Sequence, residues 1–228
     1  MAAKKAEETI VIRPIQVKRV PIRIIGDTPL IVHAWSEKAK RMMLETQTKT
    51  TKTRAKEKRR PFMDFVDSMY WLSEKPLADT DDDLEDDFLK AVASGACKWG
   101  FKSNAIKQAA NSAAYRNGWV KNQMALRGAY FVRGLHSNDF FEIQGSIPEM
   151  REDMVTVGMG SADLRYRAEF KNWYADLIIE YNENGNMTLD QIVNCIQAGG
   201  FSCGIGEWRP EKDGDHGMFH VATGDELK

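Results

Sequence analysis

The sequence predicts an α+β protein built around an antiparallel sheet, and three observations support this class. Residues 173–181 alternate between apolar and polar side chains, which indicates a half-buried strand. Phe62, Phe65 and Val66 lie at helical spacing, which indicates a helix that faces a core. The expected order along the chain is strand, helices, strands, strand, helix, strand, which is typical of an α+β fold rather than a parallel α/β fold.

The first half of the chain is expected to contain one strand followed by four helices. Residues 11–25 are rich in β-branched side chains and predict a strand that ends at Gly26, with residues 28–33 as a possible extension. Ser36 is the expected N-cap of a helix that runs to about Glu45. Three further helices are expected over residues 61–70, 84–94 and 103–116.

The helix over residues 103–116 is expected to begin with Ser103 as its cap and to present a face of small side chains. That face contains Ile106, Ala109, Ala110, Ala113 and Ala114. Small side chains allow a helix to lie close against a neighbouring element. We therefore expect this helix to pack on the sheet.

The second half of the chain is expected to be rich in strands. Short strands are predicted over residues 129–132, 140–143, 154–157, 164–167 and 218–221, the first two around a turn at 134–138 and the next two around Gly158 and Gly160. Thr188 is expected to cap a helix over residues 189–197, which Gly199 and Gly200 terminate.

This order of elements predicts a ferredoxin-like core within a single domain of residues 1–228. Residues 36–100 form a helical insertion with segregated charge, residues 147–170 form a hairpin, and residues 198–217 form a glycine-rich loop.

Composition excludes several classes of protein. The chain has 228 residues, of which 43 % are hydrophobic and 29 % are charged, so it is neither largely disordered nor fibrous. Its apolar runs are too short to span a bilayer, and residues 1–8 lack the apolar centre of a signal peptide. We therefore expect a cytoplasmic protein without a membrane partner.

The formal net charge of −1 hides a strong segregation of charge. Residues 38–60 contain ten basic and two acidic side chains and carry a net charge of +8, whereas residues 79–87 carry −7. Acidic residues just before Phe88 suit the start of a helix, because the helix dipole favours negative charge there. The two runs could also pair with each other, within one chain or between subunits.

Cysteine and histidine residues give no sign of a metal or a cofactor. Cys97, Cys195 and Cys203 are odd in number and form no CxxC pair, so neither a disulfide framework nor a zinc ribbon is indicated. His216 and His220 are spaced to share one face of a strand, but no third ligand is evident nearby. We therefore expect no bound metal and no cofactor.

The most informative stretch, residues 198–221, combines six glycines with Trp208 and Arg209. Glycine lets backbone N–H groups approach an anion closely, and a guanidinium group binds phosphate in a forked geometry. The spacing matches neither a P-loop nor a dinucleotide-binding fingerprint. Gly204, Gly206, Trp208 and Arg209 are candidate contacts to nucleic acid, and a plain turn that joins a helix to a strand is the alternative.

Lys102, Ser103 and Lys107 form a second candidate site, at the expected start of a helix. Backbone N–H groups at a helix N-terminus, together with lysine side chains, favour an anion. The alternative is a capped surface helix whose lysines contact only water.

Arg165 and Arg167 form a third candidate site, because they alternate along a strand and so point to one face. With Tyr166 between them, they suit phosphate contacts and base stacking. The alternative is a polar sheet face in which the arginines have acidic partners such as Glu169.

These stretches together resemble the RAMP superfamily, in particular the backbone subunits of CRISPR effector complexes (the seventh Cas family). A strand that leads into a short polar loop, at residues 22–33, is similar to the start of those subunits. Their helix-start motif is loosely echoed by Phe101, Ser103, Ile106, Lys107 and Arg116. Their hairpin motif resembles residues 150–169, through Arg151, Asp153, Val157, Gly158, Ala162, Leu164, Arg165 and Glu169. Their final helix and glycine-rich loop resemble residues 189–221. The chain also looks similar to uncharacterised proteins of bacteriophages and prophages, which would place it in a bacterial cytoplasm.

The resemblance implies an RRM-like domain in which residues 36–100 act as fingers and the hairpin at residues 147–170 acts as a thumb. It also implies non-catalytic binding of single-stranded nucleic acid, with RNA favoured, by subunits that stack side by side into a filament. The candidate nucleic-acid-binding residues are then Lys49, Lys52, Arg54, Lys102, Ser103, Lys107, Arg151, Arg165, Arg167, Gly204, Gly206, Trp208 and Arg209.

Three other functions remain open at this point. The same fold could serve a phage counter-defence protein that binds a host protein complex. Some relatives cut RNA with an acidic residue or a histidine in the first loop, where this chain has Asp27 and His33, so an RNA-cutting enzyme centred on His33 is a second alternative. A structural component of a virion is the third.

Overall fold

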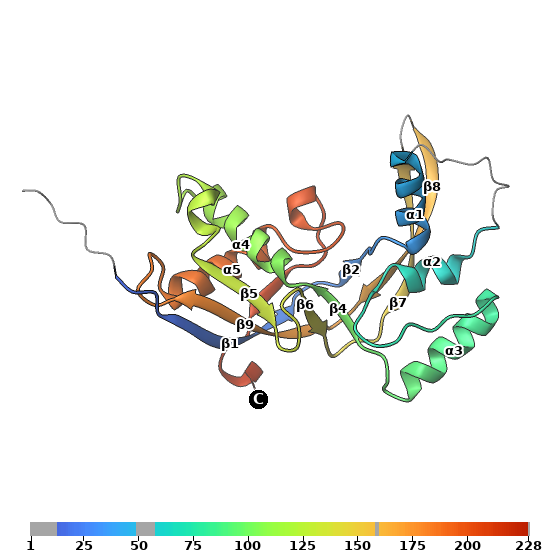
Figure 1. Cartoon of the computed structure of the whole chain (residues 1–228), viewed down its shortest axis with the longest axis horizontal. Helices are drawn as coiled ribbons and strands as arrows, with labels where there is room; N and C mark the ends of the chain where they lie inside the picture. Colours follow the sequence, from blue (N-terminus) through green and yellow to red (C-terminus); the bar gives the residue numbers. More distant parts are fainter. Residues whose placement is uncertain (1–12, 49–57, 158–159, 228) are drawn as a thin grey trace, which may run out of the picture.

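The chain folds into an elongated molecule with two parts, as a computed structural model shows (Figure 1). The structure describes residues 13–48, 58–157 and 160–227. At one end lies a sheet covered by two helices, which we call the core part. At the other end lie three helices and a long hairpin, which we call the projecting part.

The core part contains a four-stranded antiparallel sheet with the strand order β10-β1-β9-β5. These strands are β1 (Val17–Gly26), β5 (Tyr130–Gly134), β9 (Tyr174–Asn182) and β10 (Phe219–Val221). The pairing of β1 with β9 extends along nine residue pairs, including Val20 with Ile179, and both strands lie inside the sheet. The expected α+β class with an antiparallel sheet is therefore confirmed.

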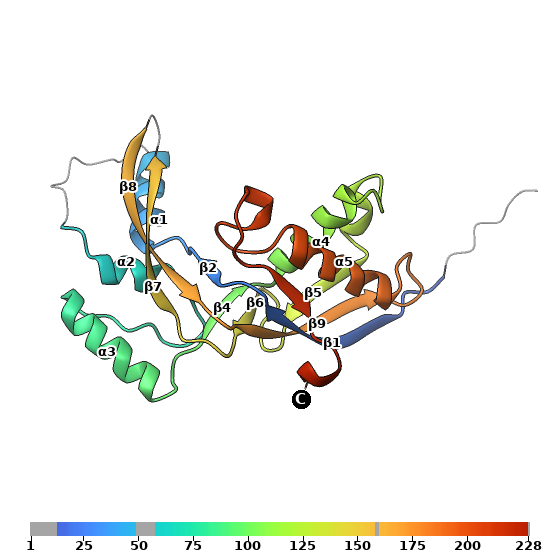
Figure 2. The same ribbon diagram turned by 180° about the vertical axis from the view of Figure 1, so that it is seen from behind.

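Helices α4 (Ser103–Arg116) and α5 (Leu189–Ser202) pack on this sheet and on each other (Figure 2). The small face of α4 allows close contact, since a Cβ atom placed on Gly199 of α5 would lie 2.6 Å from the backbone nitrogen of Ala110. The expectation that Gly199 and Gly200 end the helix is wrong. Both glycines lie inside α5, because α4 and β10 approach the backbone at this point.

The sequence predicts the N-cap of α5 correctly but not that of α4. Thr188 and Gln191 form a complete capping box at the start of α5, as the sequence predicts for Thr188. In contrast, Lys102 holds the N-cap position of α4, and no side chain caps this helix. The Ser103 hydroxyl donates instead to the carbonyl of Asn138, at 2.7 Å, so the expected cap at Ser103 is wrong.

A second sheet, with the order β2-β8-β7, connects the two parts. It contains β2 (Leu30–Val32) and a hairpin of β7 (Glu149–Val157) and β8 (Ser161–Phe170). Residues 28–33 do not extend β1, as the sequence suggested, because β2 pairs with β8 instead. The chain turns at Gly26, where a Cβ atom would lie 2.2 Å from Nε1 of the buried Trp173.

The remaining elements are a third sheet, the three helices of the projecting part and three short 3₁₀ turns. A third sheet has the order β3-β4-β6, from β3 (Tyr70–Trp71), β4 (Trp99–Lys102) and β6 (Phe140–Ile143). The helices are α1 (Glu37–Gln47), α2 (Pro61–Asp67) and α3 (Asp81–Ala93). Single 3₁₀ turns lie at η1 (Gln123–Leu126), η2 (Pro210–Lys212) and η3 (Gly224–Leu227).

The expected N-cap at Ser36 is confirmed, since its hydroxyl accepts from the backbone N–H of Ala39. Helix α2 is shorter than the apolar spacing predicts, because Tyr70 belongs to β3. The strands on either side of residues 134–138 form no ladder with each other, since β5 pairs with β9 and β6 pairs with β4.

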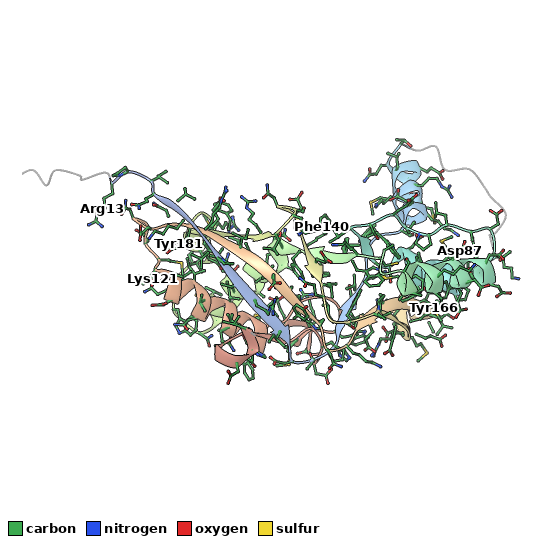
Figure 3. All side chains as sticks on the ribbon, turned by 90° about the horizontal axis from the view of Figure 1, so that it is seen from below. Arg13, Asp87, Lys121, Phe140, Tyr166 and Tyr181 are labelled. Atoms are coloured by element: carbon green, nitrogen blue, oxygen red, sulfur yellow. The ribbon has the colours of Figure 1, made fainter. Side chains whose placement is uncertain are left out.

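One cluster of buried apolar side chains runs from the core part into the projecting part. Trp173 and Phe219 lie in it on the core side, and Phe65 lies in it beneath α2. The side-chain view shows Tyr181 at one end of the molecule and Tyr166 and Asp87 at the other (Figure 3). No helix within the described ranges is long and apolar enough to cross a membrane.

Candidate nucleic-acid interface

Three hollows meet on the surface where the core part joins the projecting part. Their volumes are about 190, 700 and 410 Å³, and we call them the loop hollow, the sheet hollow and the hairpin hollow. Each of three side chains lines two of them: His33 the loop and hairpin hollows, Tyr70 the loop and sheet hollows, and Trp35 the sheet and hairpin hollows. The three hollows are therefore neighbours around residues 33–36, and we call this group of hollows the depression.

Aromatic side chains line this depression. Trp35 follows β2 and is 58 % exposed, although a tryptophan is normally largely buried in a folded domain. Tyr70 lies between the loop and sheet hollows, and burial raises the pKa of its hydroxyl. Phe140 and Tyr166, both labelled in Figure 3, line the sheet hollow and the hairpin hollow respectively.

Basic side chains alternate with these rings. The ammonium group of Lys102 lies 5.6 Å from the centre of the Tyr70 ring, and the guanidinium group of Arg59 lies 5.3 Å from the centre of the Tyr166 ring. Arg165 lines the hairpin hollow, and Arg209 lines the loop hollow. Aromatic faces next to cations are the surface on which single-stranded nucleic acids stack.

Most of these cations already have a carboxylate partner. Arg59 contacts Asp64 and Asp163, at 3.2 and 3.0 Å. Burial lowers the pKa of Arg59, but the two carboxylates together outweigh it and leave the pKa raised. Arg209 contacts Glu211 at 3.0 Å. Lys102 has no ion-pair partner among the residues that the structure describes. A phosphate group would therefore displace carboxylates at the arginines but not at Lys102.

The hairpin arginines lie in an internal ion network. Arg151 contacts Asp153 and Glu169, both at 2.8 Å, and its pKa is raised, mainly by its hydrogen bond to Asp153. Arg167 is only 7 % exposed and contacts Asp153 at 3.1 Å. Arg167 thus has an acidic partner, as the sequence allowed for Arg165 and Arg167 as the alternative to phosphate. Arg165 is more exposed and contacts Asp163 at 2.9 Å.

Of the candidate residues at the start of α4, two have partners within the chain and one faces a hollow. Ser103 is buried, and its hydroxyl donates a hydrogen bond to the carbonyl oxygen of Asn138. Lys107 donates to the carbonyl of Arg127 and lies 4.3 Å from the centre of the Phe131 ring, while burial lowers its pKa. Of the three residues that the sequence singled out here, Lys102 alone lines one of the hollows.

The glycine-rich loop lies close to β2. Gly204 and Gly206 adopt positive φ angles of 63° and 80°, and a Cβ atom on Gly206 would lie 2.5 Å from the carbonyl oxygen of Ile31. Both positions thus favour glycine because of their backbone conformation and close packing, and both also line the loop hollow. Trp208 is exposed and also has a positive φ of 53°, which is rare for a bulky residue.

The two residues singled out for catalysis have different partners. Nδ1 of His33 lies 3.8 Å from a carboxylate oxygen of Glu207 in the loop hollow, and the pKa of Glu207 is lowered, mainly by this neighbour. Asp27 instead contacts His220, at 2.6 Å, outside all three hollows.

Lys49, Lys52 and Arg54 fall outside the described residues. Among those that are described, no group of three histidine, cysteine or acidic side chains is placed to hold a metal ion. His216 contacts Asp215 and lies 3.8 Å from Glu169, while His220 contacts Asp27 and Glu226.

Sequence reasoning missed Trp35, Tyr70 and Arg59 as members of this surface. Trp35 lies just before the N-cap Ser36, in a short stretch without apolar periodicity. A tryptophan outside any apolar pattern is a sign of an exposed ring, and this was the available signal. The apolar spacing of residues 61–70 predicts a helix face for Tyr70, and Arg59 is one cation among ten in the basic run over residues 38–60. No family of proteins has a sequence pattern that matches this chain, and no curated protein is significantly similar to it.

Proposed function

We propose that this chain is a non-catalytic protein that binds single-stranded nucleic acid, with RNA favoured, in the depression around Trp35. A single observation carries the proposal: an exposed tryptophan lies where two hollows meet, and both hollows are lined by further rings and by cations. Trp35 and Tyr70 would stack on bases, and Lys102 would contact a phosphate.

We also propose that the core part is a ferredoxin-like, RAMP-like domain that assembles side by side along its ligand. The order β1, α4, β5, β9, α5, β10 follows the β-α-β-β-α-β pattern, and both helices pack on the same sheet. The β7–β8 hairpin and α1 to α3 then correspond to the thumb and the fingers expected from the sequence. This resemblance supports the proposal, and binding itself depends on the depression.

Fluorescence anisotropy with a labelled single-stranded RNA of about 40 nucleotides, a length that covers several sites of the usual size, tests the proposal. Trp35→Ala should weaken binding about tenfold, because stacking on one base contributes roughly 1–3 kcal/mol. The matched control is Trp119→Ala, since Trp119 is 55 % exposed but lies outside all three hollows. Equal losses for both variants, or no RNA binding by the wild type, would sink the proposal.

A salt titration separates stacking from charge. Lys102→Ala should reduce the slope of log affinity against log salt by about 0.7, the value for one phosphate contact on a single strand. Trp35→Ala should lower affinity without changing that slope. Repeating the titration with DNA of the same sequence asks whether the 2′-hydroxyl groups contribute.

Metal-independent RNA cleavage is a second candidate function, and one contact favours it. His33 and Glu207 face each other within 3.8 Å in the loop hollow, so a general base with a carboxylate partner lies beside the proposed ligand. Under this hypothesis the wild type cuts bound RNA in the presence of a chelator and His33→Ala does not. Intact RNA after prolonged incubation with the wild type would reject cleavage, and binding would remain as the proposed function.

A further inference from the structure

The loop between α5 and β10, drawn in red, is fixed against β2 where the two parts of the molecule join (Figures 1 and 2). The backbone N–H of Glu207 donates to the carbonyl of Ile31 at 3.0 Å, and that of His216 donates to the carbonyl of Trp208 at 3.0 Å. The positive φ of Trp208 is a strained conformation, which persists only where surrounding contacts impose it and is common at binding sites. The loop thus holds Glu207 and Arg209, on either side of Trp208, in fixed positions.

Glu207 offers a carboxylate to the loop hollow. Within the described chain its one ion-pair contact is His33, and the 3.8 Å between them exceeds hydrogen-bond distance. The pKa of Glu207 is lowered, first by His33 and also by Arg167 and Arg209, so the group is ionised at neutral pH and accepts hydrogen bonds only. Such a group repels phosphate and attracts a ligand group with N–H donors.

Arg209 offers the hollow a flat face. Its Nε and Nη2 donate to one carboxylate oxygen of Glu211, at 3.2 and 3.0 Å, and its Nη1 donates to the carbonyl of Gly206 at 3.1 Å. Because all N–H groups of a guanidinium lie in its plane, these bonds fix the group and leave its faces available. Guanidinium faces stack on unpaired bases. Stacking therefore suits Arg209 better than the forked phosphate contact expected from the sequence.

The size and neighbours of the loop hollow suit one base. Its volume of about 190 Å³ is smaller than the roughly 300–1,000 Å³ of pockets that hold drug-sized ligands, so it suits a ring system rather than a whole nucleotide. Tyr70 lines both this hollow and the sheet hollow, and Lys102 lies next to the Tyr70 ring. A phosphate at Lys102 would therefore leave the attached nucleoside beside the loop hollow.

The hydrogen-bonding groups of the hollow select among the bases. Guanine alone presents two adjacent N–H donors on its Watson–Crick edge, and its O6 acceptor lies beside them. A carboxylate accepts both donors, whereas each of the other RNA bases would place at least one acceptor against it. Gln108 lines the hollow, and its amide has no hydrogen bond within the described ranges, so it is available to donate to O6.

We propose that the loop hollow binds one unstacked guanine base of the single-stranded RNA. Glu207 accepts from N1–H and from the 2-amino group, and Arg209 stacks on the ring. This inference deepens the proposed function and rests on it, since it names the base that the same surface prefers.

Fluorescence anisotropy with labelled RNAs of about 12 nucleotides, within the usual site size of roughly 4–16, tests the preference. The RNAs consist of uridine and differ only in one central base. The wild type should bind the guanosine RNA at least about fivefold more tightly than the adenosine RNA, which is the lower end of discrimination by one bidentate contact. Inosine lacks the 2-amino group, so the inosine RNA should bind with intermediate affinity.

Glu207→Gln should bring the ratio of the guanosine and adenosine affinities close to one, because an amide presents one acceptor and one donor. The matched control is Glu74→Gln, which removes the same charge from an exposed residue outside all three hollows and should keep the ratio. A ratio compares two ligands on one protein preparation, so partial unfolding of a variant does not imitate the result. The inosine comparison needs no variant.

A salt titration tests the role of Arg209. Arg209→Ala should weaken binding of the guanosine RNA without changing the slope of log affinity against log salt. A slope reduced by about 0.7, the value for one phosphate contact, would overturn the stacking role.

Three outcomes would overturn the guanine site: equal affinities for the guanosine and adenosine RNAs, tighter binding of adenosine, or a preference for guanosine that Glu207→Gln retains. Equal affinities together with a loss on Trp35→Ala would reject the guanine site and leave the proposed function in place. A wild type that binds none of these RNAs would reject both.

Discussion

The core part and the projecting part share one apolar cluster but differ in the interactions that accompany it. In the core part, α4 and α5 approach so closely that Gly199 has no room for a side chain, and Trp173 is completely buried. In the projecting part, the hairpin contains the ion network of Arg151, Asp153 and Arg167, and α1 buries nothing. Apolar packing thus holds both parts together, and in the projecting part a nearly buried ion network is added to it. We therefore expect substitutions of exposed side chains in the projecting part to cost far less stability than substitutions of buried side chains in either part.

Truncation of a tryptophan in each part is expected to have the largest difference in effect. Trp173→Ala should cost about 3–5 kcal/mol, because it opens a cavity in the core and removes the hydrogen bond to the carbonyl of Thr28. Trp35→Ala should change stability by less than about 0.5 kcal/mol, because its side chain is mostly in solvent. Urea denaturation measures both values. Similar losses would mean that Trp35 is a structural residue, against the proposed function.

The ion network allows a second test, within the projecting part. Asp153→Ala should cost about 3 kcal/mol, since it leaves the buried Arg167 without its carboxylate. Asp82→Ala, on the exposed side of α3, should leave stability nearly unchanged. Equilibrium unfolding of both variants gives the contrast, and a small effect at Asp153 would show that the network adds little to the hairpin.

The junction between the two parts is tested by glycine substitutions. Gly206→Ala should cost about 2–3 kcal/mol, because its positive φ adds strain and its Cβ would press on the carbonyl of Ile31. Gly118→Ala also has a positive φ but meets nothing within 4 Å, so it should cost only about 1 kcal/mol. Thermal unfolding separates them, and equal values would exclude a steric role for the contact with β2.

The smallest expected effect is a pH dependence at the edge of the core sheet. Burial lowers the pKa of His220, but Asp27 and Glu226 outweigh it, so the folded pKa lies above the ordinary value near 6.5. A raised folded pKa means that the stabilisation is fully present below pH ~6.5 and is lost as the pH rises through the folded value.

His220→Asn should therefore be less stable than the wild type at acidic pH, by less than about 1 kcal/mol because the site is partly open to solvent. The difference should disappear at alkaline pH. Unfolding measured from pH 5 to pH 9 provides the check, and a constant difference across this range would show that the ion pairs contribute nothing.

Local signals predicted the local parts of the fold. The caps at Ser36 and Thr188 and the extent of α4 depend on neighbouring residues, so the sequence shows them directly. Contacts between distant segments decided the rest. A glycine ends many helices, but Gly199 lies inside α5 because α4 packs against it. In the same way, β2 joins the second sheet because it pairs with β8.

The same limit applies to the candidate site. Arg165 and Arg167 were expected to share a face, and their register opposite Asp153 and Arg151 agrees with this. Whether an arginine is available to a phosphate depends on carboxylates that lie close in space but are not visible in the local pattern. Trp35 becomes a candidate contact only because it lines two of the hollows.

The position of β1 in the sheet has a consequence for how the protein is made. β1 lies between β9 and β10, so the residues that pair with it are synthesised about 150 and 190 residues after it. At the usual speed of translation, about 5–20 residues per second, β1 is synthesised roughly 8 to 40 seconds before its partners. During that time both of its edges are unpaired, and contacts of such long range form slowly. Completion of the core sheet is thus a late event, and until then Pro21 and the charged residues around it disfavour pairing of β1 with other chains.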